Sequence, residues 1–332
     1  MIFQTPILAL LMVAGLAAVT ALWSGGFAVR VLRQWDLAAM SRAQLRMERA
    51  TELVSTLFGA VMLAELAALL LFVFNADRMA PLFVGAMCAV GTLNVNAWGF
   101  PALYLKIAVF FAAVLWLILD RADRMGRDYP LTKVKYAALL GIVPLVLADG
   151  ALELAYFAGL ETDVITSCCS KLFVPNNPNL ANQMAGVGPG LALGLLGAAG
   201  GAVALIGVVA LWTGRGLGAY AVASAALFAA GLTAVVSAIS VYIYENPNHH
   251  CPFCILKPEY GYFGYALYAP LFAGTALGLG AGMLSLFRAT PSLAGRLPGL
   301  IRTQVIWSLA GFGLFGAAVL WAIVRSHLIL FG

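Results

Sequence analysis

Residues 189–212 read PGLALGLLGAAGGAVALIGVVALW and contain no charged side chain. A run of about 20 apolar residues is long enough for one helix to cross the hydrocarbon core of a bilayer. Over the whole chain, 63% of residues are hydrophobic and only 10% are charged. This composition is typical of helices packed in lipid, because a soluble core cannot bury so much apolar surface. We therefore expect an all-α, polytopic integral membrane protein.

Seven similar runs occur elsewhere, each bounded by charge, proline or a polar loop. We expect one membrane domain, 1–332, with about eight transmembrane helices. Residues 81–100 offer a rival ninth span, but Asn94, Asn96 and Gly99 interrupt that run, and a re-entrant or surface-lying segment buried against protein fits it better. The eight predicted spans are 6–31, 53–74, 101–119, 136–160, 189–212, 219–244, 261–285 and 304–327.

The distribution of basic residues predicts the orientation. Most of the 19 Lys and Arg residues fall in the first, third, fifth and seventh interhelical segments. Basic loops stay in the cytoplasm, so both termini should be extracytoplasmic. The outer loops are then those at about 75–100, 161–188 and 245–260. The net charge of +5 is accordingly a topology signal, and we expect the lipid bilayer, not nucleic acid, as the environment.

Each predicted outer loop carries cysteine. Cys88 lies in the first loop, Cys168 and Cys169 in the second, and Cys251 and Cys254 in the third. Two interpretations of Cys88 remain open. It is either an inert, buried, small hydrophobic residue or the disulfide partner of one cysteine in the second loop.

The strongest motif is His249-His250-Cys251-Pro252-Phe253-Cys254, just before a predicted helix that begins near Gly261. A Cys-x-x-Cys at a helix start brings two sulfurs close together, and the helix dipole and a neighbouring imidazolium stabilise the attacking thiolate. This favours disulfide exchange. A structural disulfide is a second interpretation. A Cu(I) or Zn site built from His249, His250, Cys251 and Cys254 is a third.

At this motif the sequence resembles the bacterial membrane enzyme that uses quinone to reoxidise the periplasmic disulfide-forming oxidase. More distantly, it resembles the vitamin K epoxide reductases. The resemblance covers Cys251–Tyr262, and Lys257 and Pro258 stand where the bacterial enzyme has Gln-Arg. It implies that Cys251 and Cys254 are a redox pair facing quinone. It also implies the bacterial inner (plasma) membrane and a periplasmic thiol protein as partner.

Cys168 and Cys169 are adjacent in the sequence. Adjacent α-carbons are about 3.8 Å apart, whereas most disulfides need about 4.4 Å or more. A disulfide within this pair would be strained. We expect one of the two to bridge to another loop, or the pair to exchange with Cys251 and Cys254, or both to bind a soft metal as thiolates.

Charged residues also occur inside the predicted spans. Asp149 and Glu153 are spaced i, i+4 and share one helix face, with Lys106 and Glu65 on other spans as candidate partners. Charges at this depth must face protein or water. One interpretation is a proton relay or polar floor that exchanges protons for the cysteine loops. The other is a structural ion pair that holds helices together.

Tyr265 and Tyr268, at i, i+3 near the start of the seventh span, are either interfacial anchors or the lining of a quinone or lipid pocket.

Three functions follow from these features. The first is a membrane thiol–disulfide oxidoreductase, or electron-transfer protein, using Cys168, Cys169, Cys251 and Cys254. The second is a Cu or Zn handling or transport protein. The third is a disulfide-stapled subunit of a larger membrane respiratory complex.

Overall fold

A computed structural model describes residues 4–36, 41–161, 166 and 180–328. These residues form helices and turns and include no strand. Eight helical stretches are long and apolar enough to cross a membrane, and their positions match the eight predicted spans. The prediction of an all-α integral membrane protein is confirmed. The predicted orientation of the termini stays a prediction, since no membrane accompanies the helices.

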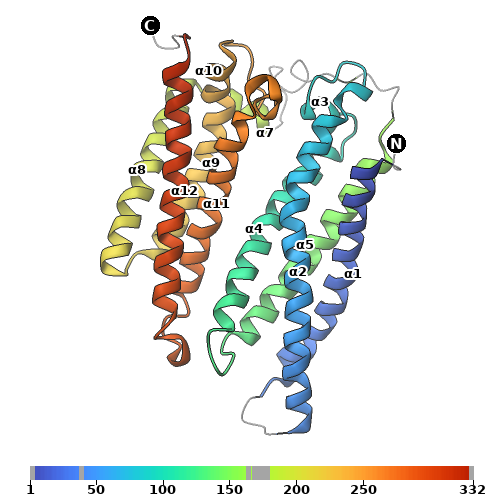
Figure 1. Cartoon of the computed structure of the whole chain (residues 1–332), viewed down its shortest axis with the longest axis vertical. Coiled ribbons are helices and arrows are strands. Elements are labelled where there is room, and N and C mark those ends of the chain that lie inside the picture. Colours follow the sequence, from blue (N-terminus) through green and yellow to red (C-terminus); the bar gives the residue numbers. More distant parts are fainter. Residues whose placement is uncertain (1–3, 37–40, 162–165, 167–179, 329–332) are drawn as a thin grey trace. The chain divides into compact units, whose positions relative to one another are not determined.

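The chain divides into two compact units, each a four-helix bundle, and the single membrane domain 1–332 stays a prediction. Unit 1 comprises residues 1–83, 92–164 and 289–296. In its bundle α1 packs on α2 and α5, and α4 packs on the same two helices (Figure 1). The four helices are α1 (Thr5–Gln34), α2 (Arg42–Arg78), α4 (Gly99–Asp123) and α5 (Thr132–Ala158).

Helix α2 begins at Arg42, well before the predicted start at residue 53, because its first turns form an amphipathic extension. Ser41 caps the helix, its hydroxyl oxygen accepting the backbone N–H of Gln44 at 3.2 Å. A cap of this kind satisfies a backbone donor that has no partner within the helix. Arginines and glutamates are frequent in these first turns, so hydropathy alone placed the start too late.

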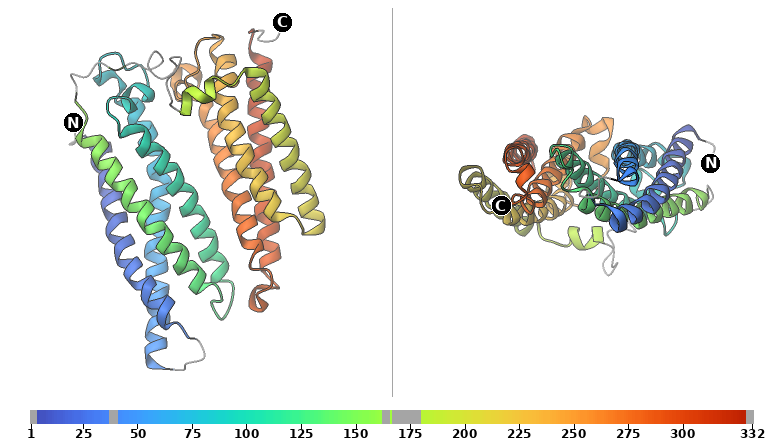
Figure 2. Two further views of the ribbon diagram at one scale, coloured as in Figure 1. Left: turned by 180° about the vertical axis from the view of Figure 1, so that it is seen from behind. Right: turned by 90° about the horizontal axis from the view of Figure 1, so that it is seen from below.

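Unit 2 comprises residues 84–91, 165–288 and 297–332. Helix α11 packs on α9 and α12, and α8 packs on the same two helices; Figure 2 shows these helices from two further sides. A Cβ on Gly278 of α11 would lie 2.3 Å from Ser224 Oγ of α9, so this close approach requires glycine. The four helices are α8 (Pro189–Thr213), α9 (Leu217–Ala234), α11 (Phe263–Ser285) and α12 (Leu297–Arg325).

The sixth predicted span is not one regular α-helix. After α9 the chain continues as a π-helical turn over Val235–Ile239 and then as α10 (Ser240–Tyr244). π-Turns interrupt the regular hydrogen-bond ladder and often mark functional sites. Here the turn lies close to the third cysteine loop, as described below.

Residues 81–100 do not form a ninth long helix. They contain the end of a 3₁₀ turn (Ala80–Leu82) and the short helix α3 (Ala89–Leu93), followed by turns that lead into α4. Cys88, Ala89 and Leu93 are buried. This agrees with a segment buried against protein. Whether it enters the membrane stays a prediction.

Candidate functional site: a buried cluster of three cysteines

The side chains of Cys88, Cys251 and Cys254 meet in unit 2. Their sulfur atoms all lie within 4.8 Å of one another, and the Sγ atoms of Cys88 and Cys251 are 3.5 Å apart. Cys88 and Cys251 are fully buried, and Cys254 is 8% exposed. None of the three forms a disulfide in this structure. The cluster joins positions more than 160 residues apart in the sequence.

The loop that carries Cys88 is held by two hydrogen bonds that its backbone carbonyls accept from Thr166. The Thr166 N–H donates to the Val84 carbonyl at 2.9 Å, and the Thr166 hydroxyl donates to the Gly91 carbonyl at 2.8 Å. Gly85 adopts a positive φ of 85°, and a Cβ there would lie 2.1 Å from the Thr166 carbonyl oxygen. Only glycine fits such a conformation and contact. Cys88 is therefore held in one position from both sides of its loop.

Two tyrosines hold the loop that carries Cys251 and Cys254. The Tyr244 hydroxyl, at the end of α10, donates to the Cys251 carbonyl at 2.6 Å. The Tyr268 hydroxyl, from α11, donates to the Pro252 carbonyl at 2.8 Å. A buried tyrosine hydroxyl needs a polar partner, and here that partner is the cysteine loop itself. The two helices thus fix the backbone of the Cys-x-x-Cys.

Lys257 connects the two cysteine loops. Its ammonium donates a hydrogen bond to the carbonyl of Met87, the residue before Cys88. Lys257 lies just after the short 3₁₀ turn Cys254–Leu256. One lysine therefore ties the segment after the Cys-x-x-Cys to the residue before Cys88.

Helix α11 begins at Phe263, two residues after the predicted start near Gly261, so the Cys-x-x-Cys precedes this helix and does not lie in its first turn. Cys254 begins a three-residue 3₁₀ turn, and α11 begins only at Phe263, because Pro258 and Gly261 form a second short turn in between. A single 3₁₀ turn has no substantial helix dipole to stabilise a thiolate. Hydrogen bonding to Cys254 and Cys88, together with burial, raises the pKa of the Cys251 thiol well above its usual range. A raised pKa disfavours the thiolate, and the predicted activation of the cysteine pair stays a prediction.

The histidines of the motif have other contacts. The His250 Nδ1 lies 3.1 Å from the Val236 carbonyl in the π-turn and donates to it, because a carbonyl oxygen can only accept. The His249 ring stacks on Tyr244, with ring centroids 4.0 Å apart. Among the described residues, the group with metal-ligand spacing consists of the three cysteines, without either histidine. The predicted set His249, His250, Cys251 and Cys254 is thus replaced by Cys88, Cys251 and Cys254.

The predicted pocket tyrosines differ from each other. Tyr268 supports the cysteine loop, as above, whereas the Tyr265 ring is 40% exposed and lies 6.3 Å from that of Tyr262. Cofactor binding by either stays a prediction.

Cys168 and Cys169 lie outside the described residues. Their predicted role likewise stays a prediction.

The sequence analysis missed Cys88 as a partner of Cys251, and it missed Tyr244. The assignment of all cysteines to outer loops was a signal for Cys88, but nothing in the sequence chooses between partners so far apart. Tyr244 lies at the end of a predicted span, where an aromatic residue is commonly an interfacial anchor, so its position in the sequence did not single it out. Only the folded loop shows that its hydroxyl meets the Cys251 carbonyl.

The charged residues inside the spans gather in unit 1. Lys106 Nζ lies 2.8 Å from Asp149 Oδ2, 2.8 Å from Glu153 Oε2 and 3.8 Å from Glu65 Oε2. All four side chains are at most 2% exposed. The predicted pairing is present. The predicted proton relay for the cysteine loops stays a prediction, since these residues belong to unit 1 and the three cysteines to unit 2.

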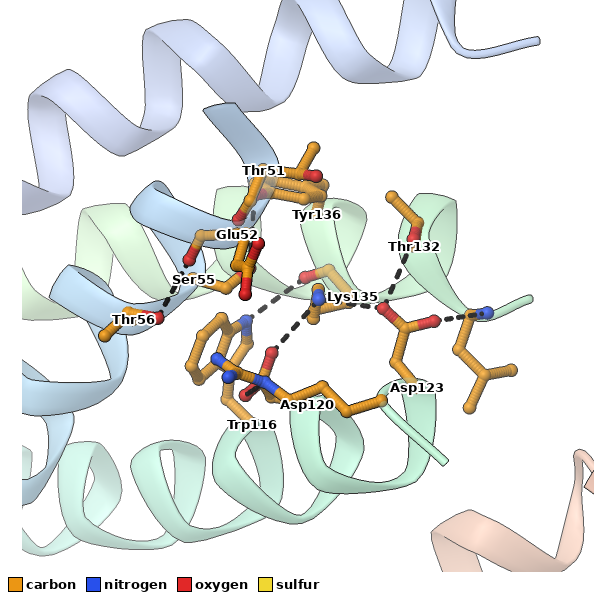
Figure 3. A network of polar contacts seen from close by, with 12 residues as sticks. Thr51, Glu52, Ser55, Thr56, Trp116, Asp120, Asp123, Thr132, Lys135 and Tyr136 are labelled. Carbon is orange, nitrogen blue, oxygen red and sulfur yellow. Dashed lines mark hydrogen bonds and ion pairs between the residues drawn. The ribbon is translucent and has the colours of Figure 1, made fainter. Parts of the chain in front are cut away.

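A second charged network lies where α4 ends and α5 begins (Figure 3). Lys135 Nζ is 3.0 Å from Asp120 Oδ1 and 2.8 Å from Asp123 Oδ2. Arg124 Nε binds Asp120 Oδ2 at 2.8 Å, while the Leu131 N–H donates to Asp123 Oδ1 at 2.8 Å. The sequence analysis used this region only for topology. Aspartates next to a turn, followed by a basic helix start, were the available signal.

Comparison with protein-family models, with curated proteins and with solved structures finds no match for this chain.

Proposed function

We propose that this integral membrane protein is a thiol–disulfide oxidoreductase whose redox centre is the buried cluster of Cys88, Cys251 and Cys254. The observation that carries the proposal is the 3.5 Å separation of the Cys88 and Cys251 sulfurs, with the Cys254 sulfur within 4.8 Å of both. Forming a disulfide from this arrangement requires a sulfur to move by only about 1.5 Å, because the S–S bond is about 2.05 Å long.

Three thiols permit a relay. Oxidation of Cys251 and Cys254 forms one S–S bond and releases two protons and two electrons, which a quinone takes up to become the quinol. The Cys88 thiolate then attacks Cys251, a Cys88–Cys251 bond forms, and Cys254 leaves as a thiolate that takes up a proton. Reduction of a disulfide in a periplasmic partner would balance the same chemistry without quinone. The resemblance at Cys251–Tyr262 favours quinone and the bacterial inner membrane.

A hollow of about 540 Å³ lies in unit 2 close to the Cys-x-x-Cys loop. Tyr260 forms part of its wall, and the Tyr260 ring packs against the Tyr244 ring with centroids 4.7 Å apart. Tyr244 in turn binds the Cys251 carbonyl. A molecule in this hollow is therefore separated from the cysteine loop by two aromatic rings. We expect a bound acceptor or partner segment here to shift the loop and expose the buried sulfurs.

Cys168 and Cys169 are the proposed entry point for electrons from a partner. Thr166, two residues before Cys168, binds the loop of Cys88 through both its N–H and its hydroxyl. In the sequence, an adjacent pair of cysteines therefore follows shortly after a residue that binds the Cys88 loop. This supports exchange between the two groups of cysteines.

Mass spectrometry after alkylation tests the proposal. Protein isolated under oxidising and reducing conditions should be alkylated with two isotopic forms of one reagent, in wild type and in Cys88→Ser, Cys251→Ser and Cys254→Ser. We expect a reversible disulfide that involves Cys251 in wild type. In Cys254→Ser it should be replaced by Cys88–Cys251. Cys168→Ser changes a proposed entry cysteine outside the cluster, so the Cys251 disulfide should still form in it, whereas exchange with a thiol partner should be impaired.

The raised pKa of Cys251 adds a pH test. Because the thiolate is the reactive form, alkylation of reduced Cys251 should be slow at pH 7 and should accelerate about tenfold for each pH unit above it, until the thiol titrates. Unfolded protein in denaturant provides the reference rate. A rate at pH 7 equal to that of unfolded protein would contradict the neutral, buried thiol.

A second function is favoured by the same geometry. Three sulfurs within 4.8 Å of one another can ligate one soft ion, because Zn–S bonds are about 2.3 Å long and thiolates select Cu(I) and Zn. Elemental analysis beside thiol counting separates the two functions. One Cu or Zn per chain, lost in each cysteine variant and with no reversible disulfide, would replace the redox proposal with metal handling.

A further inference from the structure

The charges of the four residues that gather around Lys106 in unit 1 do not balance. Glu65, Asp149 and Glu153 contribute three carboxyls, whereas Lys106 contributes one ammonium. With every group ionised, the cluster carries a net charge of −2 inside the four-helix bundle. Protein interiors penalise uncompensated charge strongly, and carboxyls in such places commonly remain neutral.

Among the described residues of the four helices in this bundle, no other charged group is near enough to correct the imbalance. Along α2, α4 and α5, the next charged residue is at least about twelve positions from the cluster, which is about 18 Å along a helix. Helix α1 packs on α2 and α5, and its charged residues Arg30 and Arg33 are exposed near its C-terminal end. Besides the three carboxyls, the Lys106 ammonium is near an uncharged aromatic side chain, 5.9 Å from the centre of the Phe72 ring.

Several carboxyl oxygens in the cluster also have no hydrogen-bond partner among the described residues. They are Glu65 Oε2, Asp149 Oδ1 and both carboxyl oxygens of Glu153, of which Oε2 forms an ion pair with Lys106 Nζ at 2.8 Å. The Glu65 side chain is only 1% exposed, and its Oε2 points toward Lys106 from 3.8 Å, too far for the bonds that Asp149 and Glu153 make at 2.8 Å. An unbonded, buried carboxylate oxygen is an acceptor without a donor. A proton supplies both the missing donor and the missing charge.

We propose that Glu65, Asp149 and Glu153 around Lys106 form a site for exchangeable protons, with Glu65 as the carboxyl that binds and releases the proton. Binding converts the Glu65 carboxylate to the neutral acid, whose O–H can donate to an oxygen of Asp149 or Glu153. Release returns the proton to water and leaves the carboxylate to approach Lys106. The site joins α2, α4 and α5, so proton occupancy should be coupled to the packing of these helices.

Infrared spectroscopy detects the proton directly. Difference spectra between mildly acidic and mildly alkaline pH should contain the carbonyl stretch of a buried neutral carboxylic acid. The band should disappear in Glu65→Gln. It should persist in Glu52→Gln, which makes the same substitution at an exposed position of the same helix.

Carbodiimide labelling provides a second test that needs no variant. These reagents modify protonated carboxyls in apolar surroundings, so Glu65 should be modified in wild-type protein and the extent should fall as the pH rises. Mass spectrometry of peptides identifies the modified residue. Glu52, which is exposed to solvent on the same helix, should remain unmodified.

Three outcomes would overturn the proposal. Absence of both the acid band and the label at every pH would mean that all carboxyls are ionised. A band that appears only when sodium and potassium are removed would identify a metal-cation site. A band that survives in Glu65→Gln would assign the proton to Asp149 or Glu153. None of these readouts depends on the cysteines, so the result is independent of the proposed redox function.

Discussion

Lys106 and Lys135 each bind two carboxylates within unit 1, yet their surroundings differ. Around Lys135, Asp120 also binds Arg124, and Asp123 accepts the Leu131 N–H, so charges balance and acceptors are used. Around Lys106, a third carboxyl is added and several oxygens have no partner among the described residues. The difference indicates that a lysine with aspartates or glutamates stabilises the fold where every charge and every acceptor has a partner. Where charges and acceptors lack partners, the same residue types form a site that can bind a proton.

Removal of the central cation should have the largest effect. In Lys106→Met three buried carboxyls lose their counterion, and breaking a buried pair in this way costs about 3–5 kcal/mol of unfolding free energy. The folded variant must hold more protons than its unfolded form, so its stability should rise as pH falls. Thermal unfolding in detergent, measured across pH, checks both statements. A small loss that is independent of pH would contradict the titrating site.

Lys135→Met is the matched substitution in the balanced network, and we expect a smaller loss. Asp120 keeps Arg124, and Asp123 keeps the Leu131 N–H and the Thr132 hydroxyl, which donates to it at 3.2 Å. Leaving one charged acceptor partly unsatisfied costs about 1–3 kcal/mol. The same unfolding assay should show this loss with little pH dependence near neutrality. A loss equal to that of Lys106→Met would remove the distinction between the two networks.

The eight spans could be predicted from the sequence because hydropathy is a local property. It could also be predicted that charged side chains inside the spans pair with one another, since helical spacing and the cost of isolated charges leave few alternatives. These residues are Glu65, Lys106, Asp149 and Glu153. In contrast, sequence patterns do not predict which carboxyl oxygens lack a hydrogen-bond partner. That depends on the distances from Lys106 Nζ, which are 2.8 Å to Glu153 Oε2 and 3.8 Å to Glu65 Oε2.

The cysteine cluster was predicted only in part. The Cys-x-x-Cys was recognisable, and the helix after it begins at Phe263, close to the predicted start near Gly261. The short turn Pro258–Tyr260 between the motif and this helix was not predicted. The pairing of Cys88 with Cys251 depends on the contacts that Thr166 and Lys257 make with the Cys88 loop, and the sequence does not predict these contacts. Loop geometry set by distant residues is the part that local patterns leave open.

Asp123→Asn should reduce stability by less than Lys135→Met. The amide retains one carbonyl oxygen, which can still accept the Leu131 N–H, but it loses the charge that attracts Lys135. Because Asp120 still pairs with Lys135, we expect a loss of about 1 kcal/mol. Unfolding of Asp123→Asn and of the double variant Asp123→Asn/Lys135→Met gives the coupling between the two residues. Additive losses would show that the pair contributes nothing beyond its separate contacts.

Arg124→Ala should have the smallest effect, although the Arg124–Asp120 distance of 2.8 Å equals the shortest ion-pair distances among the described residues of unit 1. The Arg124 side chain is 43% exposed and pairs with a residue one helical turn away, so water and salt screen the attraction. Such pairs contribute about 0.3–0.5 kcal/mol. The measurement should compare unfolding of Arg124→Ala with wild type at low and high salt, where the difference should shrink further. A loss above that of Asp123→Asn would mean that Arg124 is needed to neutralise Asp120, and that the balanced network depends on charge count as strongly as the Lys106 cluster does.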